Sequence, residues 1–188
     1  MVGTDLDPAS AGLAEIRRGS DLIHDAEDVG HAYDRLAEEI NAELAHRDPL
    51  VCCLLMGGIV PAGQLLTRFS FRCQLGYLHA TRYRGATSGG ELHWLARPFG
   101  DVKDRPVLVI DDILDEGTTL AVVEEVLRES GASAVYKAVL VKKARSRPPA
   151  TEAHFVGLEV PDLYVFGCGM DYHGFWRNLP EIRAVVPD

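Results

Sequence analysis

The 188-residue chain has few cysteines and no long hydrophobic run. Its four cysteines form no Cys-x-x-Cys pair and no disulfide framework, so we expect buried thiols. The seven histidines lack the His-Glu-x-x-His spacing of zinc enzymes, which favours surface or hydrogen-bonded roles. No apolar stretch reaches membrane-spanning length, and the first 20 residues mix acids, glycine and proline. We therefore expect no membrane association and a cytoplasmic protein.

Positive charge is also scarce. Lysine and arginine number 19 against 28 aspartates and glutamates, which gives a net charge of −9. This balance argues against a nucleic-acid-binding surface. It also provides no long-range attraction for a phosphorylated substrate, so local cations or a metal must hold one. With 47% hydrophobic residues, a chain of this length is expected to fold as one domain with a sizeable core.

Hydrophobic runs alternate with helical stripes along the chain. Residues 29–46 and 61–69 are expected to be helices, and the apolar run 50–55 between them a buried strand. Further strands are expected at 73–80, 91–96, 107–110, 134–141 and 153–158. This order predicts an α/β fold with a parallel, doubly wound sheet. Residues 84–90, rich in small residues, read as a mobile lid loop or, alternatively, a plain hairpin connection.

The most informative stretch is Val107–Thr119, V-L-V-I-D-D-I-L-D-E-G-T-T. Its first four residues predict a strand buried on both faces, and Asp111 and Asp112 follow at the end where open α/β folds bind ligands. A turn into a helix comes next, with free N–H groups and hydroxyls suited to a phosphate: Asp115, Glu116, Gly117, Thr118 and Thr119. Receiver domains also end a strand in two aspartates, but there the pair lies near the domain start. The stretch predicts a sugar-phosphate site.

This stretch resembles the phosphoribosyl pyrophosphate (PRPP) signature of the type I phosphoribosyltransferases. From about residue 50 to 179 the chain is similar to their 6-oxopurine group, the hypoxanthine-guanine phosphoribosyltransferases. The resemblance implies one phosphoribosyltransferase domain over residues 1–188. Its core would span about 29–145, with a small hood from about 1–28 and 146–188, and a lid from Tyr83 to His93 would exclude water.

Three further motifs carry the resemblance. Lys142 ends the run V-L-V-K, where the family's lysine donates to the 6-oxo group of the purine. Tyr164 stands at the position that stacks on the base, and Val165 offers its backbone to the base edge. Asp171 and Arg177 match residues that serve magnesium and pyrophosphate. Asp171 and Val165 also lie where backbone carbonyls discriminate at the purine 2-position.

The pyrophosphate-binding loop departs from the family pattern. Met56 replaces the usual lysine before Gly57 and Gly58. The family's loop contacts pyrophosphate through a strained, often cis, backbone, and that contact does not need a lysine side chain. Arg82 and Thr118 are also departures, beside the lid and in the phosphate turn.

The resemblance implies purine salvage. The enzyme would transfer the 5-phosphoribosyl group from PRPP to N9 of hypoxanthine or guanine, giving IMP or GMP and pyrophosphate. Mg²⁺ would be held by Asp111 and Asp112, which also hold the ribose hydroxyls, and by Asp171. Asp115 would lie beside purine N7 and relay a proton.

Two alternatives stay open at this point. A xanthine or guanine preference is one, because the sequence does not rank the three 6-oxopurines. The other is a regulatory protein with the same core that senses PRPP or nucleotides and binds RNA, although such proteins need a basic face. The family also implies a homodimer or homotetramer.

Overall fold

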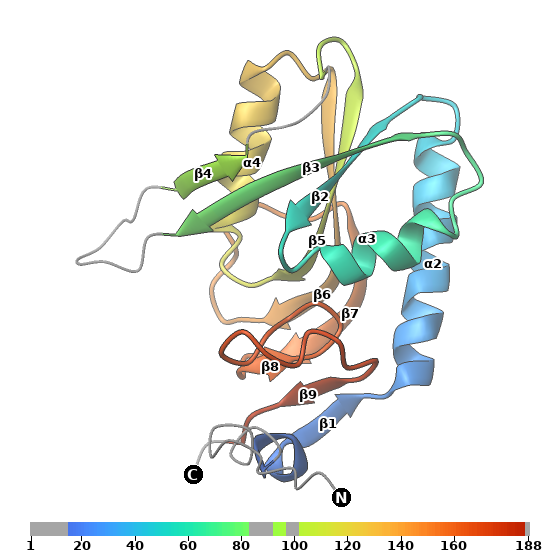
Figure 1. Cartoon of the computed structure of the whole chain (residues 1–188). Coiled ribbons are helices and arrows are strands. Elements are labelled where there is room, and N and C mark those ends of the chain that lie inside the picture. Colours follow the sequence, from blue (N-terminus) through green and yellow to red (C-terminus); the bar gives the residue numbers. More distant parts are fainter. Residues whose placement is uncertain (1–14, 83–91, 97–101, 187–188) are drawn as a thin grey trace, which may run out of the picture.

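A computed structural model describes residues 15–82, 92–96 and 102–186 of the chain. Its main sheet has six strands in the order β4-β3-β2-β5-β6-β7 (Figure 1). These strands are β2 (Leu50–Leu55), β3 (Gln74–Arg82), β4 (Leu92–Ala96), β5 (Pro106–Leu114), β6 (Ala134–Ala144) and β7 (Phe155–Pro161). β3, β2, β5, β6 and β7 are mutually parallel, whereas β4 pairs antiparallel with β3. The predicted parallel sheet is thus confirmed, with one antiparallel strand at its edge.

Helices cover both faces of this sheet, as expected for a doubly wound fold. α2 (Ala26–Leu44) and α3 (Ile59–Leu66) lie on one face and α4 (Thr118–Glu129) on the other (Figure 1). Successive β5 residues point to opposite faces. Leu108 and Ile110 therefore join the core under α2, and Val107 and Val109 join the core under α4. Because both faces are covered, β5 is apolar at every position before Asp111.

β5 is longer than the sequence predicted. The expected strand 107–110 extends to Leu114, so Asp111 and Asp112 lie within the strand rather than after it. β6 continues the ladder alongside, pairing Asp111 with Val139 and Leu114 with Lys142. This extension fixes the backbone of the acidic pair at the carboxyl edge of the sheet, where we expect ligands to bind.

A second, three-stranded sheet lies beyond that edge. This hood sheet has the order β1-β9-β8 and is antiparallel, with β1 (Asp21–His24), β8 (Val165–Phe166) and β9 (Ile182–Ala184). It combines an early segment with the end of the chain, in agreement with the expected hood. β7, however, belongs to the main sheet, so the hood draws on the residues after Pro161 rather than on everything after 146. The single-domain prediction over 1–188 stays a prediction.

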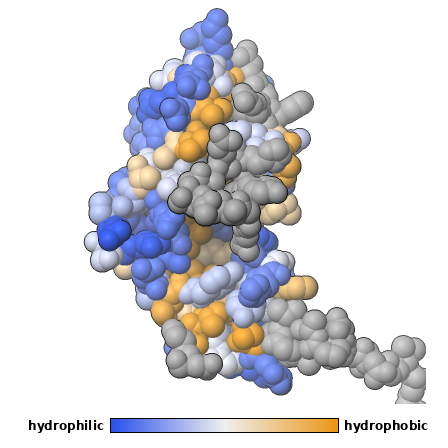
Figure 2. Space-filling model, turned by 90° about the vertical axis from the view of Figure 1, so that its left-hand side faces the viewer, coloured by the Kyte–Doolittle hydropathy of each residue, from blue (hydrophilic) through white to orange (hydrophobic). Residues whose placement is uncertain are grey.

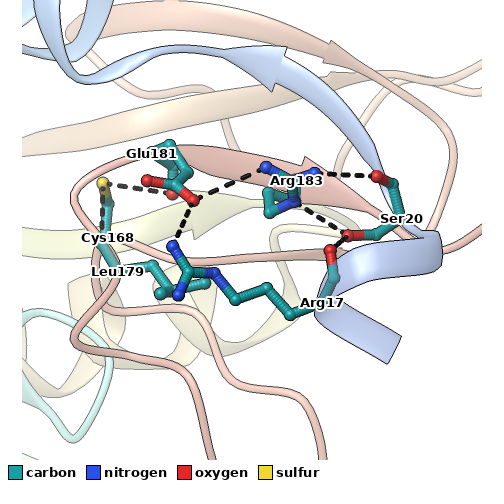
Figure 3. Close-up of polar contacts among 6 residues, drawn as sticks. All are labelled: Arg17, Ser20, Cys168, Leu179, Glu181 and Arg183. Carbon is teal, nitrogen blue, oxygen red and sulfur yellow. Dashed lines mark hydrogen bonds and ion pairs between the residues drawn. The ribbon is translucent and has the colours of Figure 1, made fainter. Parts of the chain in front are cut away.

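Polar contacts tie the two parts of the hood together (Figure 3). Arg183 donates to the hydroxyl and the carbonyl of Ser20, both at 2.9 Å. Glu181 lies between two guanidinium groups, 3.1 Å from Arg17 and 3.5 Å from Arg183. The Cys168 thiol donates to the carbonyl of Leu179 at 3.4 Å. These contacts anchor the segment before β1 to β9. They also hold the loop between β8 and β9, residues 167–181, which we call the hood loop.

Two expectations from the sequence concern other parts of the molecule. The lid, Tyr83 included, lies outside the described residues apart from its last two positions, which begin β4.

No helix within the described ranges combines the length and apolar character needed to cross a membrane. The face seen in Figure 2 is hydrophilic over much of its area, with hydrophobic patches in both its upper and its lower part.

Candidate active site

Two adjacent carboxylates form the centre of the site. Asp112 is only 7% exposed, and its backbone N–H donates to Oδ1 of Asp111 at 2.9 Å. Burial raises the pKa of Asp111 well above its ordinary value, and the neighbouring Asp112 charge raises it further. Burial also raises the pKa of Asp112, although the hydrogen bond with Asp111 and the charge of Arg177 oppose this. A buried and a partly buried carboxylate side by side favour the binding of a cation.

The Met56–Gly58 turn packs directly on this acidic pair. A Cβ on Gly57 would lie 2.1 Å from Oδ2 of Asp112, closer than any side chain tolerates. The Leu55–Met56 peptide bond is cis, as the family resemblance implied for this loop. The hood loop meets the same turn, since a Cβ on Gly169 would lie 2.3 Å from the Gly57 carbonyl oxygen. Only glycine fits at both positions. The turn therefore packs against both the acidic pair and the hood loop.

The phosphate turn follows β5 and borders a cavity of about 210 Å³. Gly117 adopts φ +73°, and a Cβ there would lie 3.0 Å from the Thr151 carbonyl oxygen, so glycine is required. α4 begins at the next residue without a side-chain cap, leaving its first N–H groups free to bind an anion. The acidic pair, the turn and five apolar residues line this cavity. They are Asp111, Asp112, Asp115, Glu116, Gly117 and Thr119, with Leu54, Leu55, Ala80, Ile113 and Leu120.

A second cavity of about 170 Å³ also borders Asp115. Its lining combines residues from β5, β6 and the hood: Asp112, Ile113, Asp115, Lys143, Tyr164, Val165, Met170 and Asp171. The Tyr164 ring is half-exposed and is held in place by its hydroxyl, which donates to the Asp171 carbonyl at 3.1 Å, and by edge-on contact with Tyr172. Asp112, Ile113 and Asp115 border both cavities. Two ligands could therefore meet at Asp115.

Arg177 connects the hood loop to the acidic pair. Its guanidinium donates to Oδ1 of Asp171 at 2.5 Å and to the Gly169 carbonyl at 2.5 Å, and lies 3.9 Å from Oδ2 of Asp112. The other Asp171 oxygen accepts from the Gly174 N–H at 2.6 Å. Both carboxylate oxygens of Asp171 are thus hydrogen-bonded. Arg177 contacts both the hood loop and Asp112.

Comparisons with known proteins agree with this geometry. A family model described as a phosphoribosyl transferase domain matches residues 19–173. A hypoxanthine-guanine phosphoribosyltransferase of Staphylococcus epidermidis is 32% identical over 161 residues, covering 85% of this chain and 89% of that protein. The chain belongs to the hypoxanthine-guanine phosphoribosyltransferase family. It is also 34% identical over 154 residues to the bifunctional protein TilS/HprT of Listeria innocua, covering 81% of this chain but only 24% of that longer protein.

A solved structure shows the same fold. The crystal structure of a hypoxanthine phosphoribosyltransferase from Staphylococcus aureus superposes with a TM-score of 0.83 at 27% identity, covering 96% of this chain and 97% of that one. The predicted type I phosphoribosyltransferase fold is therefore confirmed, including the small sheet that terminal segments add to the main one.

The structure separates two neighbouring lysines at the end of β6. Lys142, to which the family motif assigned the purine contact, points to Glu152, with its ammonium 2.7 Å from Oε2, and does not line the second cavity. Lys143 lines that cavity, and its ammonium donates to Oδ2 of Asp115 at 2.9 Å. Consecutive strand residues point to opposite sides, so only one of the two faces the site. Lys143, and not Lys142, is therefore positioned to contact a ligand in that cavity.

Asp115 carries a second cation that the sequence reasoning missed. The guanidinium of Arg145 binds its Oδ1, while Lys143 binds its Oδ2. Partial burial raises the pKa of Asp115, but the hydrogen bonds from Lys143 and Arg145 outweigh that effect and hold the pKa below its ordinary value. Asp115 is therefore ionised at neutral pH. Arg145 carried no recognisable sequence signal, because it lies just beyond the motif.

Two other expected contacts do not reach the cavities. The Met56 side chain is about half-exposed and lines neither cavity, so a pyrophosphate contact here must come from the backbone. Thr118 is exposed and also absent from the lining, whereas Thr119 is part of it. Gly57 and Arg177 line neither cavity and meet the site through their contacts with Asp112, whereas Tyr83 lies outside the described residues.

The donors suit magnesium better than zinc. No group of three histidine, cysteine or acidic side chains gathers into a ready metal cage in the described part of the chain. Mg²⁺ is usually held by one or two carboxylates together with substrate phosphates and water. Asp111 and Asp112, which line the first cavity, match that pattern.

Proposed function

We propose that the protein transfers the 5-phosphoribosyl group from PRPP to N9 of hypoxanthine or guanine, giving IMP or GMP and pyrophosphate. The observation that carries the proposal is the pair of cavities that share Asp112, Ile113 and Asp115. One cavity has the features of a phosphate site, and the other has an aromatic face and a lysine. A base in the second cavity would stand beside a sugar phosphate in the first.

The first cavity would hold PRPP. The free N–H groups at the start of α4, with Gly117 and Thr119, would bind the 5-phosphate. Asp111 and Asp112 would hold the ribose hydroxyls and Mg²⁺, which when bound would neutralise charge on the departing pyrophosphate. Arg177 would bind pyrophosphate together with the backbone of Gly57. Because pyrophosphate gains charge as its bond to C1 breaks, Arg177 would stabilise the transition state more than the ground state.

The second cavity would hold the base. The Tyr164 ring would stack on the purine, and the Val165 backbone would meet its edge. Lys143 is a hydrogen-bond donor only, so it selects a carbonyl over an amino group at the 6-position. Backbone carbonyls near Val165 and Asp171 would read the 2-position, where hypoxanthine, guanine and xanthine differ.

Asp115 would act on the base during transfer. N9 forms its bond to C1 as pyrophosphate leaves, and the proton on N7 must then be lost. An ionised Asp115 beside N7 can accept that proton and offset positive charge on the ribosyl ring. The lid containing Tyr83 would exclude water from this centre, and that role stays a prediction.

A spectrophotometric assay tests the proposal. The protein is incubated with PRPP and Mg²⁺ and with hypoxanthine, guanine, xanthine or adenine in turn. We expect turnover with hypoxanthine and guanine and at most a trace with adenine. Faster turnover with xanthine than with hypoxanthine would support the xanthine/guanine alternative. No turnover with any of the four bases would refute the proposal.

The cellular compartment and the oligomeric state of the enzyme are also proposals. Its four cysteines are all free, which suits the reducing cytoplasm. We propose a homodimer or homotetramer, supported by the exposed apolar side chains of Ile59 and Leu75. Light scattering would distinguish these states from a monomer.

A further inference from the structure

Arg145 stands next to the proposed reaction centre without bordering either cavity. It follows β6 directly, and its guanidinium binds Oδ1 of Asp115. On its other side, its Nε lies 3.9 Å from Oδ2 of Asp162, which precedes the base-stacking Tyr164 by two residues. Arg145 thus bridges the phosphate turn and the segment that carries the base contacts.

The two cations on Asp115 have different surroundings. Lys143 lines the second cavity, where it would be needed by the carbonyl of a base. Arg145 lines neither cavity and would not be drawn away by a ligand. A carboxylate held by Lys143 alone would compete with the base for the ammonium, because a charged partner attracts it more strongly than a neutral carbonyl. The second cation weakens that competition.

We propose that Arg145 is a positioning residue that holds Asp115 toward the base and leaves Lys143 available to the purine carbonyl. The guanidinium, flanked by Asp115, Asp162 and Glu116, keeps its charge at any working pH. It fixes one carboxylate oxygen while the other remains with Lys143. This inference rests on the proposed function and adds a determinant of base affinity to it.

The test is a comparison of Arg145→Gln with Arg145→Lys. We expect Arg145→Gln to lower kcat/KM for hypoxanthine by about 10-fold, mostly through a higher base KM, because the lost contact is a charge-assisted hydrogen bond. The KM for PRPP should change by less than about 3-fold, since Lys143, through which Arg145 acts on the base, lines only the second cavity. Arg145→Lys should recover most of the loss. Arg47→Gln is the matched control, because Arg47 pairs with Glu43 at 2.9 Å on the surface far from the site.

A second measurement asks whether Arg145 acts through Asp115. In an Asp115→Asn background, Arg145→Gln should have no further effect on the base KM, because the amide no longer competes for a cation. Thermal melts of every variant separate lost folding from lost positioning. Equal effects with and without the Asp115 carboxylate would overturn the inference.

Other outcomes are equally decisive. An Arg145→Gln enzyme with wild-type base KM, or with a lower one, would refute the inference while leaving the proposed function standing. Equal rises in the KM for PRPP and for the base would show a general structural role and would also overturn it. Failure of the proposed function looks different: the folded wild-type protein would then turn over none of the purines.

Discussion

Gly57 lies against the carboxylate of Asp112, so closely that a Cβ would stand 2.1 Å from Oδ2. Asp112 is buried and cannot move aside without leaving the acidic pair. The glycine therefore does two things at once. It lets the turn approach the acids and, under the proposed function, it leaves the backbone free to face pyrophosphate.

The first prediction follows from this contact. Gly57→Val should lower turnover by at least about 100-fold, because the branched side chain displaces Asp112 from the positions of ribose and metal. Gly63→Ala is the matched control, since a Cβ there meets nothing within 4 Å. Met56→Lys should change the KM for PRPP only modestly, because the side chain at 56 lines neither cavity. Steady-state kinetics with thermal melts measure all three. A folded, fully active Gly57→Val enzyme would show that the turn plays no part in binding.

The second prediction concerns Asp115. Asp115→Asn should leave a folded protein with turnover lowered roughly 10²- to 10⁴-fold, the range typical of losing a positioned acid or base. Substrate KM values should change less. Turnover near that of wild type would remove Asp115 from the proton path.

Much of this arrangement was predictable from sequence, because local signals were strong. β2 was predicted with its observed bounds, since its apolar run is sharply bounded by polar and turn residues. The phosphate turn was visible because glycine and threonine occupy fixed places in a motif. The hood sheet was predicted only as terminal segments. Its strands have two to four residues, too few for a periodicity, and β1 pairs with β9 across more than 150 positions, as Asp21 does with Ala184.

The environment of the base was less predictable. A motif places a lysine at the end of a strand, but two lysines in succession leave open which one faces the site. Only the position of β6 relative to Asp115 and Glu152 resolves this. Arg145 could not be predicted at all, because its role depends on two carboxylates that the fold brings to it from other segments.

The third prediction separates the two lysines. Lys143→Ala should lower kcat/KM for hypoxanthine and guanine by about 10- to 100-fold, because the donor to the 6-oxo group is lost. Any trace activity with adenine should fall less or rise. Lys142→Ala is the matched control and should behave like wild type, since Lys142 pairs with the exposed Glu152. The reverse pattern would return the purine contact to Lys142.

The last prediction concerns stability. Lys137 is almost fully buried on β6, and its ammonium binds Glu124 of α4 and the Thr151 hydroxyl. Burial raises the pKa of Glu124, but hydrogen bonds from Lys137 and Arg128 outweigh it and lower the pKa from 4.5 to about 2. Glu124→Gln should cost roughly 3 to 5 kcal/mol at pH 7, because it leaves a buried ammonium without its partner.

The pH dependence of that cost follows from the sign of the shift. A carboxylate whose pKa is lower in the folded state stabilises the fold fully above its unfolded pKa and loses this contribution as pH falls through the folded pKa. The stability difference between wild type and Glu124→Gln should therefore be constant above about pH 5 and shrink between the unfolded pKa of 4.5 and about 2. Urea denaturation across this range measures it, with Glu43→Gln, at an exposed pair, as the control. A difference that does not change with pH would show that Glu124 stabilises the fold by packing rather than by charge.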